Sequence, residues 1–143
     1  PFVGGSVPRV VLDPNVLISA LITPRGASAR ILVELRRGAF ELISSPALLA
    51  ELRTVLMRDK FRQYTSVEEV EAFLELIRAE SIVIEDPKPS AVRVTDDPGD
   101  EYLVALARAG RVDALVSGDP DILGLRSRFP VRSPREFLDL LSG

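Results

Sequence analysis

The feature that most constrains the fold is the alternation of short apolar runs with longer amphipathic stretches along all 143 residues. Short runs rich in β-branched residues predict strands, and apolar residues at helical spacing predict helices between them. Strands that alternate with helices form a parallel sheet with helices on both faces. The sequence therefore predicts an α/β protein with a central sheet of about five strands, built as a single domain over residues 1–143.

The positions of these elements follow from apolar spacing and from capping residues. The predicted strands are 9–12, 40–44, 81–85, 114–117 and a short piece around 131. Helices often begin at Ser or Asp followed by Pro, or by an acidic residue three positions on. These signals predict helices over 28–37, 45–57, 66–79, 97–110 and 133–141, a short helix after Asp119, and a surface loop over 85–95.

Two predicted strands lead into an aspartate. Asp13 directly follows the first strand, and Asp119 follows the strand at 114–117. Ligands bind at the carboxyl ends of strands in open α/β sheets, so an acidic pocket is expected there. The chain has no His and no Cys, which excludes an imidazole base, a thiolate nucleophile and the usual zinc ligands. Clustered carboxylates need a cation to offset their repulsion, and oxygen ligands suit Mg²⁺ or Mn²⁺.

Each acidic candidate also has an ordinary structural interpretation. In an extended segment, Asp13 and Asn15 would project to the same side, but Asp13 before a proline also suits a turn or a cap. Glu51 lies at the edge of the apolar stripe of its helix, where its direction is ambiguous, and most Glu side chains are solvated. Asp119 and Asp121 lie where a strand turns into a short helix, and either could cap that helix.

Helix phase separates Asp100 from its neighbour Glu101. At 100° per residue, Asp100 falls inside the apolar stripe of its helix, whereas Glu101 falls well outside it; the stripe consists of Leu103, Val104 and Ala107. Asp100 should therefore face the core. With Asp97 as the N-cap, Asp100 would also occupy the third helical position of a capping box, and a carboxylate there can still reach a metal.

Four segments in order resemble the PIN-domain ribonucleases: 10–20, which ends a strand in Asp13-Pro14-Asn15; 45–52, which contains Glu51; 97–107, which contains Asp100; and 114–121, which contains Ser117-Gly118-Asp119. Their order and spacing agree with that family across nearly the whole chain. The strand that ends in Ser-Gly-Asp is typical of the bacterial and archaeal branch assigned as toxins of toxin-antitoxin systems.

The resemblance implies a three-layer α/β/α fold and a metal-dependent endoribonuclease. The implied catalytic carboxylates are Asp13, Glu51, Asp100 and Asp119, of which Asp13, Asp100 and Asp119 bind one or two Mg²⁺ or Mn²⁺ ions. Asn15, Ser117 and Asp121 would support that shell. The implied substrate is single-stranded RNA, for which Arg25 and Arg53 are candidate contacts. An antitoxin partner and a homodimer are also expected.

Other functions are compatible with parts of this pattern. A receiver-like phosphotransfer domain would need a Lys at a later strand end, whereas the lysines here are Lys60 and Lys88. A haloacid-dehalogenase-like domain would need Asp-x-Asp, and the third position here is Asn15. A non-catalytic PIN module that binds RNA or protein is a third alternative, against which the four carboxylates argue. A net charge of −3 argues against binding of nucleic acid through a positive charge spread over the whole surface.

We also expect a cytoplasmic protein that does not enter a membrane. No apolar run approaches the roughly 20 residues that are needed to span a bilayer.

Overall fold

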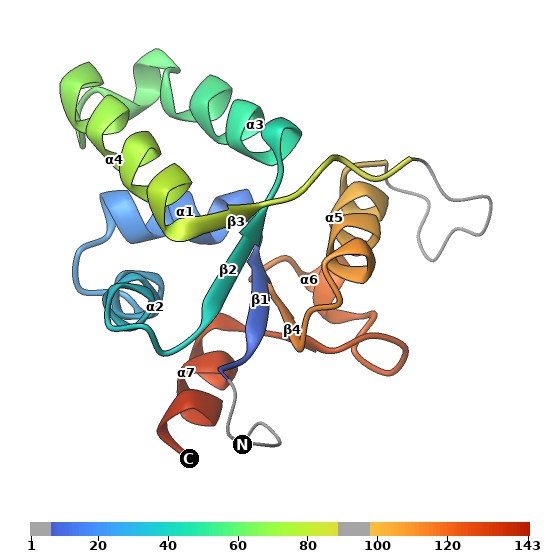
Figure 1. Cartoon of the computed structure of the whole chain (residues 1–143). Coiled ribbons are helices and arrows are strands. Elements are labelled where there is room, and N and C mark those ends of the chain that lie inside the picture. The colour runs from blue at the N-terminus through green and yellow to red at the C-terminus, as the bar shows by residue number, and fades with distance from the viewer. Residues whose placement is uncertain (1–6, 89–97) are drawn as a thin grey trace.

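The computed structural model describes residues 7–88 and 98–143, and its centre is a parallel sheet (Figure 1). The strands are β1 (Arg9–Leu12), β2 (Glu41–Ser44), β3 (Ser81–Val83), β4 (Ala114–Val116) and β5 (Val131–Arg132). They lie in the order β3-β2-β1-β4-β5, and every neighbouring pair is parallel. The predicted parallel sheet of about five strands is therefore confirmed, with each strand at its expected place.

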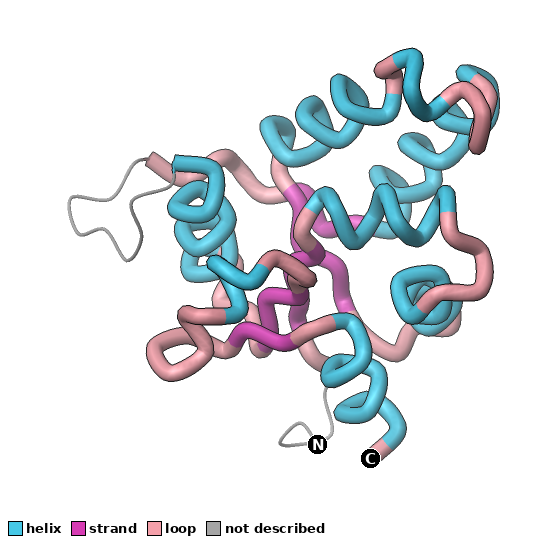
Figure 2. Tube along the Cα trace, turned by 180° about the vertical axis from the view of Figure 1, so that it is seen from behind, coloured by secondary structure: helices cyan, strands magenta, loops and turns pink. Residues whose placement is uncertain are grey.

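Helices cover both faces of this sheet. Over the described residues they are α1 (Pro14–Ile22), α2 (Ala27–Arg36), α3 (Pro46–Leu56), α4 (Val67–Glu80), α5 (Pro98–Ala109), α6 (Pro120–Leu123) and α7 (Pro134–Ser142), with a 3₁₀ turn at Asp59–Phe61. Figures 1 and 2 show α1, α2 and α7 on one side of the sheet and α5 on the other. α5 packs on β1 and β4, and α2 packs on α1 and α7. The three-layer α/β/α arrangement is confirmed.

The helix starts follow the capping signals in the sequence. Ser66 and Ser133 form capping boxes with Glu69 and Glu136, and the Ser45 side chain accepts a hydrogen bond from the backbone N–H of Leu48. The predicted and observed ends of these helices agree to within one residue. α5 begins at Pro98 as expected. The predicted cap Asp97, and the loop residues 89–95, lie outside the described residues.

The expectation that Asp13 and Asn15 lie in an extended segment is wrong. Asp13 is the N-cap of α1, Pro14 is its first residue, and Asn15 is already helical. The Asp13 side chain is buried, whereas Asn15 is exposed. The physical reason is that an Asp cap followed by Pro starts a helix, because Pro fixes φ at a helical value and its missing N–H is not needed there.

The sheet order places β1 at its centre and creates a switch point beside it. From β1 the chain builds β2 and β3 on one side and then returns to place β4 on the other. Val10 and Val11 of β1 are fully buried, as expected for a strand covered on both faces. Ligands of open α/β sheets bind at such a switch point, outside the carboxyl ends of the strands.

Among the described residues, no single helix is long and apolar enough to cross a membrane. One pair of helices, α1 and α2, which are bent by 97°, has the length and composition of a membrane span, and only these two properties support that reading.

Candidate functional site

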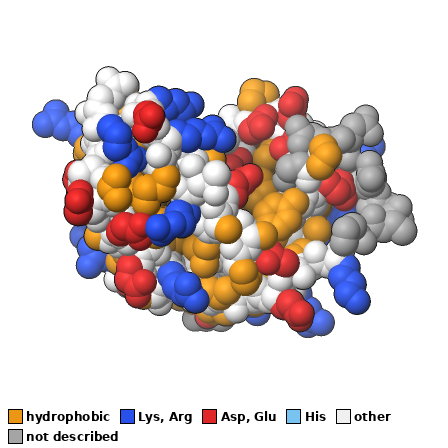
Figure 3. All heavy atoms as spheres, turned by 90° about the horizontal axis from the view of Figure 1, so that it is seen from above, with side chains coloured by type: hydrophobic (Ala, Val, Ile, Leu, Met, Phe, Trp, Pro, Cys, Tyr) orange, Lys and Arg blue, Asp and Glu red, His pale blue; other side chains and the backbone are white. Residues whose placement is uncertain are grey.

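A pocket of about 160 Å³ lies at the carboxyl ends of β1 and β4. Its lining residues, which we call the acidic pocket, are Asp13, Pro14, Asn15, Ile18, Glu51, Val55, Asp100, Leu103 and Asp119. On the face that Figure 3 shows, acidic side chains gather around a hollow in the surface. The structure thus brings the four carboxylates predicted as catalytic, from four separate segments of the chain, to one place.

Asp13 and Asp119 are connected through Ser117. Leu12 pairs with Val116 in the sheet, so the residues that follow the two strands are neighbours. The Ser117 hydroxyl donates to Asp13 Oδ2 at 2.7 Å and accepts from the backbone N–H of Asp119 at 3.0 Å. Asp13 Oδ1 accepts from the backbone N–H of Asn15 at 2.9 Å. Asp13 is therefore held in one orientation, with Ser117 as the positioning group.

Asp100, Asp119 and Asp121 form a compact group of carboxylates. One oxygen from each lies within 4.8 Å of the other two. Asp100 is buried, as the helix phase predicts, and Asp119 caps α6 by accepting from the backbone N–H of Asp121 at 2.8 Å. Asp121, expected only to support the metal shell, thus joins this group. Oxygen atoms from three carboxylates at this spacing are a donor set that fits a hard divalent cation.

Burial and mutual repulsion perturb the carboxyl groups of the acidic pocket. Burial raises the pKa of Asp13; hydrogen bonds from Asn15 and Ser117 lower it, and the charge of Asp119 raises it. Partial burial raises the pKa of Glu51, and the charge of Asp13 raises it further. The nearby negative charges therefore make it harder for the carboxyl groups of Asp13 and Glu51 to ionise, and a bound cation would offset this repulsion.

These shifts predict how the stability of the metal-free protein depends on pH. A raised folded-state pKa means that the native state binds a proton more tightly than the unfolded chain, so stability is lost as pH rises through that pKa. The melting temperature in EDTA should therefore increase when the pH is lowered from neutral toward 4.5, the ordinary pKa of Glu. Glu69, Glu71 and Glu136 have lowered pKa values and oppose this only below their ordinary value of 4.5.

Thermal melting of the wild type and Asp13→Asn in EDTA at both pH values checks this prediction. Asn keeps the cap of α1 but cannot ionise, so the melting temperature of the variant should rise less than that of the wild type when the pH is lowered. It should also melt a few degrees higher than the wild type near neutral pH, because one of the repelling charges is gone. An equal rise in melting temperature for the two proteins would contradict the raised pKa of Asp13.

One cluster beside the acidic pocket was not predicted. The Ser45 and Tyr102 hydroxyls are 2.6 Å apart, and Tyr102 also donates to Asp86 at 3.3 Å. Burial raises the pKa of Tyr102 to about 12, the hydrogen bond with Ser45 lowers it, and the charges of Asp86 and Glu51 raise it. The sequence marks Ser45 only as a cap, and it contains no local signal that Tyr102 meets it.

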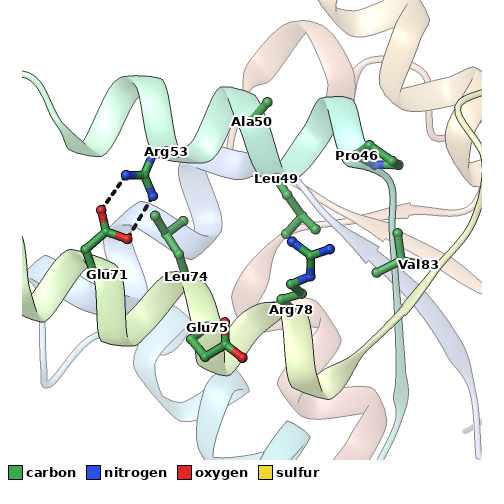
Figure 4. A pocket seen from close by; sticks show the side chains of 9 residues that line it. All are labelled: Pro46, Leu49, Ala50, Arg53, Glu71, Leu74, Glu75, Arg78 and Val83. Carbon is green, nitrogen blue, oxygen red and sulfur yellow. Dashed lines mark hydrogen bonds and ion pairs between the residues drawn. The ribbon is translucent and has the colours of Figure 1, made fainter.

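The two predicted RNA-binding arginines lie outside the acidic pocket. Arg25 is exposed in the turn between α1 and α2. Arg53 projects from α3 toward α4, where it forms a two-pronged ion pair with Glu71 at the edge of a separate groove (Figure 4). A role of Arg53 in RNA binding would require this ion pair to open. The roles of Arg25 and Arg53 stay predictions.

Comparison with known proteins identifies the family. The PIN domain family model matches residues 9–121, and the chain belongs to this family. An uncharacterized protein of Methanocaldococcus jannaschii, MJ1680, is 28% identical over 142 residues, which cover 92% of this chain and 90% of that protein. PIN domains are generally metal-dependent nucleases. Membership in this family replaces the receiver-like and haloacid-dehalogenase-like interpretations.

Two solved structures share the fold. The crystal structure of PAE2754 from Pyrobaculum aerophilum is 17% identical, with a TM-score of 0.66 over 95% of this chain and 90% of that one. VapBC2 from Rickettsia felis, bound to a DNA fragment from its promoter, is 16% identical, with a TM-score of 0.59 over 87% of this chain and 98% of that one. Both similarities support the three-layer arrangement.

Proposed function

We propose that this protein is a Mg²⁺- or Mn²⁺-dependent endoribonuclease that hydrolyses phosphodiester bonds of single-stranded RNA. The observation that carries the proposal is the acidic pocket, in which Asp100 and Asp119 place carboxylate oxygens within 4.8 Å of each other and of Asp121. Asp13 and Glu51 border the same pocket. Four unrelated surface carboxylates would have no reason to meet at the switch point of the sheet.

Each residue contributes a separate part of the chemistry. Asp100 and Asp119 would hold the cation together with Asp13, which lines the same pocket, and Asp121 lies beside them. The Ser117 hydroxyl donates a hydrogen bond to Asp13 and fixes its orientation. Glu51 lies at the open side, where its carboxylate can orient water. When bound, the cation would make a water molecule more acidic and would offset the negative charge of the phosphate. Asn15, exposed at the rim, can donate a hydrogen bond to a phosphate oxygen.

The biological role that fits this activity is that of a toxin in a toxin-antitoxin pair. The supporting observation is that the fold of this chain is similar to that of VapBC2, which is bound to a DNA fragment from its promoter. We propose an antitoxin protein as a partner, a homodimer as the assembly and the cytoplasm as the location. Residues 1–143 would act as a single nuclease domain, with Arg25 and Arg53 as candidate contacts to RNA.

The test is cleavage of a labelled single-stranded RNA oligonucleotide by the purified protein in Mg²⁺ or Mn²⁺. A DNA oligonucleotide of the same sequence is the matched control. Cleavage of RNA in preference to DNA supports the proposed substrate. Binding of RNA without cleavage would instead favour a non-catalytic PIN module.

Helix phase also predicts which of two adjacent acidic residues on α5 is needed. Asp100→Asn should reduce RNA cleavage far more than Glu101→Gln, because Asp100 belongs to the carboxylate group with Asp119 and Asp121 and Glu101 does not. Both substitutions remove one charge and keep the shape, so each is a control for the other. The measurement is the initial rate of RNA cleavage at saturating Mg²⁺. Equal losses, or a larger loss for Glu101→Gln, would contradict the assignment.

A further inference from the structure

A ring of hydrogen bonds closes around the start of α3. The Ser45 hydroxyl accepts from the backbone N–H of Leu48 at 3.2 Å and contacts the Tyr102 hydroxyl at 2.6 Å. Tyr102 donates to Asp86 Oδ1 at 3.3 Å. Asp86 Oδ2 in turn accepts from the backbone N–H of Ala47 at 3.1 Å. Two side chains thus cap α3, and Tyr102 joins those two caps.

The number of protons available fixes the direction of this ring. A carboxylate only accepts hydrogen bonds, and a phenol has one proton to donate. If Tyr102 donates to Asp86, then the short contact with Ser45 requires the serine hydroxyl to donate to Tyr102. Ser45 still accepts from the Leu48 N–H with a lone pair. Every donor therefore has an acceptor, and the hydroxyl of Tyr102 is the only group in the ring that comes from α5.

The ring links two helices that each carry a carboxylate of the acidic pocket. Tyr102 follows Asp100 by two residues on α5, and Ser45 caps α3, which carries Glu51. The main packing partners of these helices differ: α3 packs on α1 and α4, whereas α5 packs on β1 and β4. Figure 1 shows the chain after β3, which contains Asp86, running from the start of α3 toward α5.

We propose that Tyr102 is a positioning residue, whose hydroxyl ties α3 to α5 and thereby sets the separation of Glu51 from Asp100 across the acidic pocket. This inference rests on the proposed function, because that separation matters only if the carboxylates act together on a cation. Groups that orient metal ligands without touching the metal typically change metal affinity or activity by roughly 10- to 100-fold when they are removed. Tyr102 is such a group, although its side chain is not among those that line the acidic pocket.

The experiment is calorimetric titration of Mn²⁺ into three proteins: the wild type, Tyr102→Phe and Tyr64→Phe. Phe keeps the ring and removes only the hydroxyl. Tyr64 is the other tyrosine of the chain and is 59% exposed, so its variant is the matched control. We expect Tyr102→Phe to bind Mn²⁺ roughly tenfold more weakly than the wild type, and Tyr64→Phe to bind it equally well. The titrations are run well below the melting temperature of every variant, where a change in global stability does not alter affinity.

Asp86→Asn provides a second route to the same result. It keeps an oxygen for the Ala47 N–H but places an NH₂ donor where Asp86 Oδ1 accepted the Tyr102 proton, so it should also weaken Mn²⁺ binding. In Tyr102→Phe/Asp86→Asn the two losses should be less than additive, because both act through one ring. Equal Mn²⁺ affinity of the wild type, Tyr102→Phe and Asp86→Asn would overturn this inference alone. No binding of Mn²⁺ to the wild type would overturn the proposed function and this inference with it.

Discussion

Asp119→Asn is expected to lower the rate of RNA cleavage by roughly a hundredfold or more, the loss typical when a fixed electrostatic group is removed from a catalytic site. The variant should keep its fold. Asn retains the oxygen that accepts from the backbone N–H of Asp121 at 2.8 Å and is a good helix cap, so α6 still begins in the same place. What it loses is one negative charge from the group formed with Asp100 and Asp121.

The measurement is turnover of an RNA oligonucleotide, with thermal melting to show that the variant is folded. Asp59→Asn is the matched control, because Asp59 is exposed in the 3₁₀ turn and does not line the acidic pocket. It should cleave RNA as the wild type does. Turnover by Asp119→Asn close to that of the control would remove Asp119 from the catalytic group and leave Asp121 as the carboxylate that follows β4.

The sheet was predictable because its strands are buried on both faces. Val10 and Val11, and likewise Leu115 and Val116, lie in runs of apolar residues that are too short for helices, and all four are fully buried. Helix starts were equally clear where a Ser side chain caps the helix, as at Ser66 and Ser133. The order of the strands was not predicted, because it depends on which strands pair across the fold.

Helix α1 was not predicted because its apolar residues do not repeat at helical spacing. Val16, Leu17 and Ile18 are all buried, so the apolar residues of this helix are consecutive and not spaced three or four apart. The cap and proline at Asp13 and Pro14 were the available signal, and they are the same kind of signal that correctly placed α3. A strand that passes directly into a buried helix lacks the change in pattern on which such predictions depend.

The acidic pocket was predictable in part. Asp13 and Asp119 follow from their strand ends, and Asp100 follows from its helix phase. Glu51 could not be placed by its helix phase and was assigned by resemblance alone. The contacts that the sequence could not predict join residues far apart in the chain: Tyr102 with Ser45, and Arg53 with Glu71. Such pairs form only when the fold brings separate helices together.

Removal of divalent cations is expected to abolish cleavage completely. The carboxylates of Asp13 and Glu51 already repel nearby acidic groups, and none of the described residues that line the pocket carries a positive charge to offset that of a phosphate. Mg²⁺ or Mn²⁺ should restore activity, because both prefer oxygen ligands. Zn²⁺ should restore it poorly, since the chain has no His or Cys to provide the ligands that zinc prefers.

The most direct test of the acidic pocket as a catalytic metal site is RNA cleavage by the wild type in EDTA, followed by addition of Mg²⁺, Mn²⁺ or Zn²⁺ in excess of the chelator. Asp119→Asn, purified in parallel, controls for a contaminating ribonuclease. We predict no cleavage in EDTA, full recovery with Mg²⁺ or Mn²⁺, and a recovered rate lower by roughly a hundredfold or more in the variant. Cleavage that persists in EDTA, recovery with Zn²⁺ alone, or equal cleavage by Asp119→Asn would contradict a divalent-cation nuclease built on these carboxylates.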